Sequence, residues 1–435
     1  MSSMYEIAYA AASNRLCLFS GTGFSKSVSD GKAPGWKNLL EDLCDLLPAK
    51  NNPKRALFPP RKNSPLSLEE AAQVISLKLT QEKRDINLEI AKIIEPLDID
   101  GDVDEIQKFF EEHTFRVITT NYDKLAELLA GEERVQSITP GLPIPRSSTD
   151  VKVYHVHGSI DSPQNMVVTS DDYFKFMNGD SYFSRKLSTI LHENTVVILG
   201  YSLADTNLKR IISDYKSFSK NHVIGSNLFF VSRSPVEQNI KDFYFHCFGI
   251  RVIDEIEIEH FFGRLNRSIP TVKNIIARSH RSIDRVIHRR YSFKDSFVKL
   301  EDSFFRFISS LSAKGLSLND KRVVEVTGEI LKRKKEMTLE IGAWEQYEHL
   351  ASWLIYLGSF FEIRDTSIKS IYLMAVKRSM KTMSQDKYFG YSWKAYELWQ
   401  AGWPSINASN RALIKTYVED QRLGTDAQSI VNSVA

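Results

Sequence analysis

Cysteine is scarce in this chain. The three cysteines, Cys17, Cys44 and Cys247, lie far apart and form no CxxC pair. Structural zinc sites normally need closely paired ligands, so we predict that the protein binds no metal. Few cysteines are also typical of proteins in a reducing compartment, and we therefore expect a cytoplasmic location.

Long apolar runs and an excess of one charge are also missing. No segment approaches the roughly 20 apolar residues of a membrane span, and the amino terminus lacks the pattern of a signal peptide. The 57 Lys and Arg residues are nearly balanced by 54 Asp and Glu residues, so the bulk charge does not single out nucleic acid as a partner. We expect a soluble, intracellular protein with no membrane partner.

A basic stretch, RSHRSIDRVIHRR at 278–290, departs locally from that balance. It could bind nucleic acid or an acidic partner, or it could be the solvated face of a helix. We interpret the stretch as a connector, and direct nucleic-acid binding stays open at this point.

Strand and helix signals alternate over the first two-thirds of the 435 residues. Apolar strand-like runs occupy 15–20, 115–120, 151–158, 195–200, 227–232 and 249–254. This alternation predicts an α/β domain over 1–285, with a Rossmann-like, doubly wound and mainly parallel sheet. Helical patterns between the first two strands predict a helical insertion at about 48–113.

Residues 286–435 carry only helical patterns, with apolar residues three and four positions apart. We predict a helical carboxy-terminal domain that serves assembly or regulation, and hence a homo-oligomer. Trp393, Trp399 and Trp403 belong to a residue type enriched at interface centres, although they could equally fill the core of a helical bundle.

Four short polar segments each follow an apolar strand-like run. They are LFSGTGFS at 18–25, TTNYDKL at 119–125, HVHGS at 155–159 and LGYSLADTNL at 199–208. The carboxyl ends of parallel strands meet at one edge of a sheet, where open α/β folds bind nucleotides. We therefore expect the four segments to form one nucleotide pocket.

The first segment supplies Gly21, Thr22, Gly23 and Ser25. Glycine lets the main chain approach a diphosphate, and the amides at a helix start bind negative charge. A merely tight connection between strand and helix would use the same residues. The pattern is not GxxxxGK[ST], which disfavours a P-loop ATPase.

The second and third segments supply groups suited to chemistry. Asn121 can hydrogen-bond a ribose hydroxyl or order a water molecule, and Asp123 can accept from a carboxamide, unless either residue only caps a helix. His157, at a strand end, titrates near neutral pH and suits general-base catalysis, while Gly158 leaves room for a ligand. His155 lies further inside the strand, and we assign it a structural role.

The fourth segment offers Gly200 and Ser202 to the ribose or phosphate of a nucleotide. Asp205 either joins them or caps the following helix. The joint occurrence of the four segments, in this order and at the strand ends of one predicted sheet, resembles the sirtuin superfamily. The resemblance covers roughly residues 1–265.

Two departures separate the chain from sirtuin deacylases, which carry zinc-binding cysteine pairs and a Gln where Thr120 stands here. The chain is similar here to the sirtuin-like NADases of bacterial antiphage defence. The similarity lies in four patterns taken together, which are GxGFS…P.W..L with Trp36, TTNYD, HG and GYSxxD. The resemblance implies that NAD+ is the substrate and that Asn121 and His157 are the catalytic pair. It further implies that Asp123 stabilises charge and that Thr120 and Trp36 belong to the NAD+ pocket.

The resemblance also implies how such an enzyme is controlled. A NADase that depletes its own cell of NAD+ needs an off state, and a short helical domain looks like that of chains partnered with a HerA-type hexameric ATPase. Other members of the group sense phage proteins themselves.

Three other functions remain open from the sequence. A protein deacylase would turn over acyl-lysine peptides, and a non-catalytic sensor of NAD or ADP-ribose would bind without releasing nicotinamide. A nucleic-acid-binding effector built around 278–290 would show strongly salt-dependent DNA binding.

Overall fold

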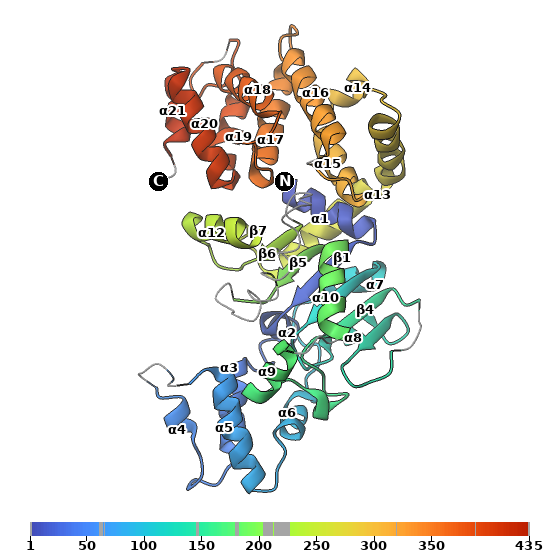
Figure 1. Cartoon of the computed structure of the whole chain (residues 1–435), viewed down its shortest axis with the longest axis vertical. Coiled ribbons are helices and arrows are strands. Elements are labelled where there is room, and N and C mark those ends of the chain that lie inside the picture. The colour runs from blue at the N-terminus through green and yellow to red at the C-terminus, as the bar shows by residue number, and fades with distance from the viewer. Residues whose placement is uncertain are drawn as a thin grey trace.

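The computed structural model describes residues 2–60, 64, 66–144, 148–178, 182–202, 212, 227–318, 320–387 and 389–433. The helix expected at 203–215 lies outside these residues apart from Ile212, and so does Asp205. Figure 1 shows three tiers, with a sheet in the middle, a helical module below it and the carboxy-terminal helices above it.

A seven-stranded sheet forms the middle tier, and all its strands are parallel. The strands are β1 (Leu16–Ser20), β2 (Phe115–Thr119), β3 (Val135–Ile138), β4 (Val151–His155), β5 (Thr195–Leu199), β6 (Leu228–Val231) and β7 (Ile250–Ile253). Their order is β3-β4-β2-β1-β5-β6-β7. The predicted doubly wound α/β fold is confirmed.

The central strands are apolar throughout because both faces of the sheet are covered. Every residue of β1 and β5 is buried, as expected for strands enclosed by helices on each side. One face packs against α1 (Ser2–Ala12), α2 (Thr22–Val28), α7 (Asp104–Glu112), α8 (Leu125–Ala130) and α13 (Ile258–His288). The other face packs against α10 (Tyr182–Glu193) and α12 (Gln238–Phe248).

Two features differ from the sequence prediction. The strand β3, with the sequence VQSI, was not predicted because it is short and carries no apolar run. The stretch 278–290, interpreted as a connector, is helical up to His288 and forms the end of the 31-residue helix α13, which runs from the sheet core into the carboxy-terminal core. Ile283, Val286 and Ile287 on this half are buried, so it is a packed amphipathic helix whose basic residues alternate with core positions.

The lower tier is a small helical module between β1 and β2. It consists of α3 (Trp36–Asp45), α4 (Lys54–Leu57), α5 (Leu68–Gln81) and α6 (Ile86–Ile94). These helices share their own apolar core, which also receives Tyr122, Met166 and Val168 from the segments that follow β2 and β4. Helix α5 begins with a capping box in which Ser67 and Glu70 bond each other's main-chain amides. Helix α9 (Ser170–Asn178) packs against α5.

The upper tier contains the carboxy-terminal helices, which share one core with the end of α13. They are α14 (Asp295–Val298), α15 (Ser303–Ala313), α16 (Lys321–Met337), α17 (Trp344–Phe360), α18 (Lys369–Lys381), α19 (Trp393–Gly402), α20 (Ala408–Asp420) and α21 (Thr425–Val431). Trp399 and Trp403 are at most 1% exposed, so they fill this core and are not free for an interface. Trp393 is 48% exposed.

The carboxy-terminal helices meet the sheet at the amino ends of its strands. Arg15, directly before β1, donates from Nη1 to the carbonyl oxygen of Ser312 at 2.6 Å. Tyr9 of α1 shares a 2.9 Å hydrogen bond between hydroxyls with Ser310 of α15. The carboxyl ends of the strands therefore face away from the upper tier and toward the helical module (Figure 1). No helix in the described part of the chain is long and apolar enough to cross a membrane.

Candidate functional site

A cleft of about 230 Å³ opens at the carboxyl ends of β1, β2, β4 and β5. The strand order reverses between β1 and β5, and ligands of open α/β sheets bind at such a switch point. The helical module forms the opposite wall through Trp36, Leu39, Ile94 and Leu97. Residues from all four predicted segments line this one cleft.

The glycines of the first and fourth segments interlock at the switch point. The amide of Gly21 donates to the Leu199 carbonyl at 2.9 Å, and the amide of Gly23 donates to the Gly200 carbonyl at 2.8 Å. Gly200 has a φ of +70°, and a Cβ built on it would lie 2.0 Å from the main-chain nitrogen of Phe24. The two loops can therefore approach this closely only because both carry glycine.

We expect Gly200→Ala to destabilise the protein more than Gly131→Ala. Both positions have positive φ, which costs an alanine about 1–3 kcal/mol. No described atom lies within 4 Å of a Cβ on Gly131. An alanine at position 200 would in addition clash with the main chain of Phe24, which should lower the free energy of unfolding by about 1–3 kcal/mol more. Urea unfolding of both variants measures the difference. Equal unfolding midpoints would show that the close approach of Gly200 to the loop at 21–24 tolerates a side chain.

A chain of hydrogen bonds joins the first and second segments. Asn121 Nδ2 donates to Ser25 Oγ at 2.7 Å, and Ser25 Oγ donates to Asp123 Oδ2 at 2.7 Å. The main-chain nitrogen of Asn121 donates to Thr119 Oγ1, and this hydroxyl in turn donates to the main-chain carbonyl of Ser20. No partner for Asn121 Oδ1 is found among the described residues, so this oxygen is available to accept from a ligand in the cleft.

Asp123 combines a structural contact with a position on the cleft. Its Oδ1 accepts from the main-chain amide of Leu125, the first residue of α8, at 3.2 Å, while Lys124 and not Asp123 is the N-cap residue of that helix. Its Oδ2 accepts from Ser25. Burial raises the pKa of the Asp123 carboxyl, although these two hydrogen bonds act in the opposite direction.

His157 is 4% exposed and lines the cleft. Its ring makes edge contacts with Tyr173 and Phe176, with centroids 5.2 and 5.3 Å apart. Within the described ranges no hydrogen bond to the imidazole is found. Burial lowers the pKa of His157 to about 4, so the ring is neutral at pH 7 and able to accept a proton.

The buried neutral state of His157 predicts a loss of stability in acid. Since the pKa falls from about 6.5 in the unfolded chain to about 4 in the folded one, this contribution is intact above pH 6.5 and is lost as the pH falls toward 4. Between pH 7 and pH 5 the wild type should lose about 2 kcal/mol more than His157→Phe, which cannot titrate. Urea unfolding at both pH values measures this, and parallel losses would contradict it.

His155 is placed differently from His157. It is completely buried, does not line the cleft and hydrogen-bonds Glu127 through Nε2 at 2.7 Å. Its Nδ1 lies 3.2 Å from the main-chain carbonyl oxygen of Asn121. These contacts fit the structural role expected for His155, in a network that sequence reasoning did not detect.

The structure brings most of the predicted site residues together. Those that line the cleft are Thr22, Ser25, Trp36, Thr120, Asn121, Asp123, His157, Gly200 and Ser202. Gly21 and Gly23 lie beneath it, where they admit the Tyr201 ring and the Gly200 main chain.

The prediction that Gly158 leaves room for a ligand is wrong. Its φ is +86°, and a Cβ there would lie 2.8 Å from Met166 Cα. The missing side chain therefore accommodates the chain at 165–166 and not the cleft.

Several aromatic residues of the cleft were not predicted. Tyr201 hydrogen-bonds Thr120 through its hydroxyl at 2.6 Å and packs 5.2 Å from the Phe19 ring. Tyr122 packs edge-on to Trp36. Tyr201 and Tyr122 stand inside two of the predicted segments, so their position was a usable signal, whereas nothing in the sequence connects Tyr173 of α9 with His157.

Among the described residues, no group of three His, Cys, Asp or Glu side chains is arranged to hold a metal ion. The polar groups of the cleft are amide, hydroxyl, carboxyl and imidazole groups, which bind ligands by hydrogen bonds. We expect the cleft to work with these groups alone.

Comparison with known proteins gives partial matches. Residues 116–253 match the SIR2-like domain family. A protein named NAD(+) hydrolase ThsA from Enterococcus faecium is 38% identical over 104 residues, which are 22% of this chain and 22% of that protein. A protein of the same name from Bacillus cereus (strain MSX-D12) is 33% identical over 103 residues, 23% of this chain and 22% of that protein.

A further match is to "Defense-associated sirtuin 2" from Bacillus subtilis, 26% identical over 143 residues, which are 32% of this chain and 14% of that protein. Each match spans less than a quarter of the relative's own length. The matched SIR2-like region covers β2 from Arg116 onward and all of β4, and Asn121 and His157 each follow two residues after the end of these strands. Both strands belong to the parallel sheet. Residues 116–253 therefore form a SIR2-like domain, and parts of the chain are similar to proteins named NAD(+) hydrolase and defence-associated sirtuin.

Proposed function

We propose that this protein is an NAD+ hydrolase that cleaves the bond between nicotinamide and ribose. The observation that carries the proposal is the convergence of Asn121, Asp123 and His157 on one cleft at the switch point of a parallel sheet. The relatives named NAD(+) hydrolase support the same substrate. The products are nicotinamide, ADP-ribose and a proton.

The reaction needs little help at the leaving group. The nicotinamide nitrogen of NAD+ is already cationic, so the bond to C1′ of the ribose breaks with its electron pair going to nicotinamide, which leaves neutral. The ribose passes through an oxocarbenium-like state. The protein must therefore hold the ribose, stabilise positive charge and deliver water to C1′.

The cleft residues divide these tasks. The Oδ1 of Asn121, which has no partner among the described residues, accepts from a ribose hydroxyl or the attacking water, while Nδ2 donates to Ser25. The neutral His157 takes the proton that this water loses on attack, an effect worth about 10²–10⁴-fold. The Asp123 carboxylate lies one hydrogen bond beyond Ser25 and stabilises the cationic ribose by its charge.

The loops of the first and fourth segments are proposed to bind the rest of the dinucleotide. Thr22, the first residue of α2, lines the cleft and can donate its hydroxyl to a phosphate oxygen. Ser202 is exposed at the cleft and can donate to a phosphate or ribose oxygen. The aromatic rings of Trp36 and Tyr201 offer flat apolar surfaces for a nicotinamide or adenine ring.

In the cell we propose that this protein is an effector of defence against phage, which depletes NAD and is kept inactive until it is triggered. The relative named as a defence-associated sirtuin supports this role. The carboxy-terminal helices are proposed to serve homo-oligomerisation and contact with a partner such as a HerA-type hexameric ATPase. Light scattering of the chain alone and mixed with that ATPase tests this arrangement.

One assay tests the proposed activity. The purified chain is incubated with NAD+, alone and with its partner ATPase, and the products are resolved by chromatography. Equal amounts of nicotinamide and ADP-ribose are expected. Binding of NAD+ without product in either condition would indicate a sensor, and consumption only in the presence of an acyl-lysine peptide would indicate a deacylase.

A further inference from the structure

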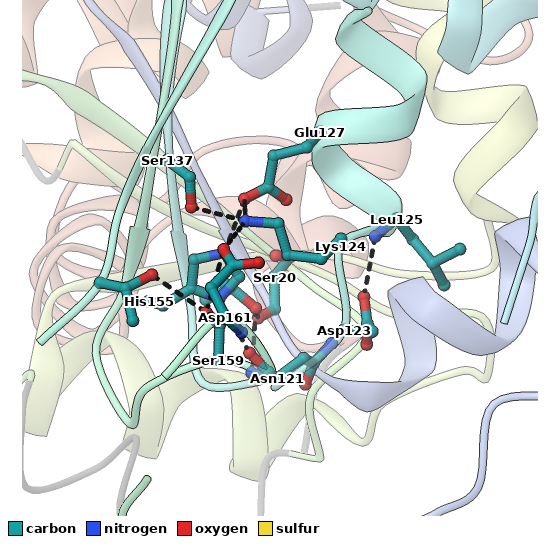
Figure 2. A network of polar contacts seen from close by, with 12 residues as sticks. Ser20, Asn121, Asp123, Lys124, Leu125, Glu127, Ser137, His155, Ser159 and Asp161 are labelled. Atoms are coloured by element: carbon teal, nitrogen blue, oxygen red, sulfur yellow. Dashed lines mark hydrogen bonds and ion pairs between the residues drawn. The ribbon is translucent and has the colours of Figure 1, made fainter. Parts of the chain in front are cut away.

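A network of hydrogen bonds and ion pairs adjoins Asn121 (Figure 2). Lys124 and Glu127 at the start of α8 form it together with His155 at the end of β4. Asp161 and Ser137 complete it. Of these groups only the His155 ring contacts the Asn121 main chain, through Nδ1 and the carbonyl oxygen at 3.2 Å.

The hydrogen bonds fix which atoms of His155 carry hydrogen. A carbonyl oxygen only accepts, so Nδ1 donates to Asn121. Glu127 Oε1 accepts from Lys124 Nζ at 2.8 Å and lies 2.7 Å from His155 Nε2. Burial alone would raise the pKa of Glu127, but His155 and Lys124 outweigh it and lower the pKa to about 2, so the carboxylate accepts from Nε2 as well.

The remaining members hold this pair in place. Lys124 Nζ donates to Ser137 Oγ at 2.7 Å and to Asp161 Oδ2 at 2.5 Å besides Glu127, so all three of its hydrogens have acceptors. Glu127 is 8% exposed. The network thus links β3, β4, the segment after β4 and α8, with Lys124 Nζ at its centre and the His155 ring joined to it through Glu127.

We propose that His155 is a positioning residue for the reaction at the cleft, acting through the main-chain carbonyl of Asn121. This inference rests on the proposed NAD+ cleavage. The peptide groups on either side of the Asn121 Cα are both held, the amide by Thr119 and the carbonyl by His155. Fixing both sets the direction in which the Asn121 side chain enters the cleft.

Two substitutions separate this role from simple stabilisation. In His155→Asn the side-chain amide falls near the place of Nδ1 and can still donate to the Asn121 carbonyl, but it loses Glu127. In His155→Gln the amide falls near the place of Nε2 and can still donate to Glu127, but it loses Asn121. Positioning and stabilisation therefore predict opposite orders for the two variants.

We expect His155→Asn to keep more of the wild-type kcat than His155→Gln, although it is the less stable of the two. For His155→Gln, kcat should fall on the order of 10- to 100-fold with little change in KM, because a displaced group costs rate more than binding. Val153→Ala, an apolar change on the same face of β4, controls for destabilisation and should keep its kcat.

The order of kcat decides the proposal. If His155→Gln turns over NAD+ as fast as His155→Asn or faster, the positioning role is overturned. If neither variant folds, Glu127→Leu, which takes away the acceptor that holds the ring at Nε2, takes their place, and an unchanged kcat there overturns the positioning role.

A readout that does not depend on turnover separates this proposal from the proposed function. In protein labelled with ¹⁵N-asparagine, the Asn121 side-chain signal is identified by its loss in Asn121→Ala. His155→Gln should shift this signal while Val153→Ala leaves it in place, even if the wild type cleaves no NAD+. An unmoved signal overturns the positioning role, whereas an inactive wild type with a shifted signal overturns only the proposed function.

Discussion

His157→Ala should reduce NAD+ consumption by about 10²–10⁴-fold while the protein keeps its fold. The imidazole is neutral at pH 7, lines the cleft and has no hydrogen-bond partner among the described residues, so its removal takes away the proton acceptor and little else. The lost edge contacts with Tyr173 and Phe176 should lower stability only modestly. Nicotinamide release measured under saturating NAD+ tests this.

His113→Ala is the matched control for the removal of a histidine. His113 follows α7, packs against the ring of Phe109 at 4.9 Å and does not line the cleft. It should melt at a temperature similar to that of His157→Ala and keep its turnover. A His157→Ala variant with wild-type turnover and normal melting would remove His157 from the mechanism.

Asn121→Ala should lower kcat on the order of 10²-fold or more. The change removes Oδ1 from the cleft, and it leaves Ser25 without the Nδ2 donor that holds its hydroxyl toward Asp123. The variant therefore loses the oxygen that positions water, and the Asp123 carboxylate that stabilises charge is held less firmly. The rate of nicotinamide release in single-turnover conditions measures the chemical step separately from product release.

Ser25→Ala separates the two effects of Asn121→Ala. It removes the link between Asn121 and Asp123 but leaves Oδ1 in the cleft. We expect its kcat to lie between those of the wild type and Asn121→Ala. If Asn121→Ala is no slower than Ser25→Ala, the oxygen of Asn121 has no role of its own.

The sequence was sufficient to predict six of the seven strands and to assign the proposed catalytic residues to one edge of the sheet. Strands β1 and β5 are apolar on both faces, and a polar residue directly after such a run must lie at the sheet edge. For this reason Asn121 and His157, which are 36 positions apart along the chain, could be assigned to one cleft before any contact was known.

Contacts between distant segments could not be predicted in the same way. Ser25 was expected to belong to the nucleotide pocket, and the structure places its hydroxyl between Asn121 and Asp123. The glycine at 158 was expected to face a ligand because nothing in a single sequence shows that 165–166 returns beside it. Such features depend on where loops come to rest, which local periodicity does not record.

The sheet stands between the cleft and the carboxy-terminal helices of the same chain. Strand β1 touches the helical tier at one end through Arg15 and the cleft at the other through Gly21, with about 17 Å of extended chain between them. Within one copy of the chain, none of the described residues of those helices lines the cleft, so we expect a signal received there to reach the cleft as a displacement along α1 and the strands. Slowed hydrogen exchange in α1 on addition of an activating partner would trace that route.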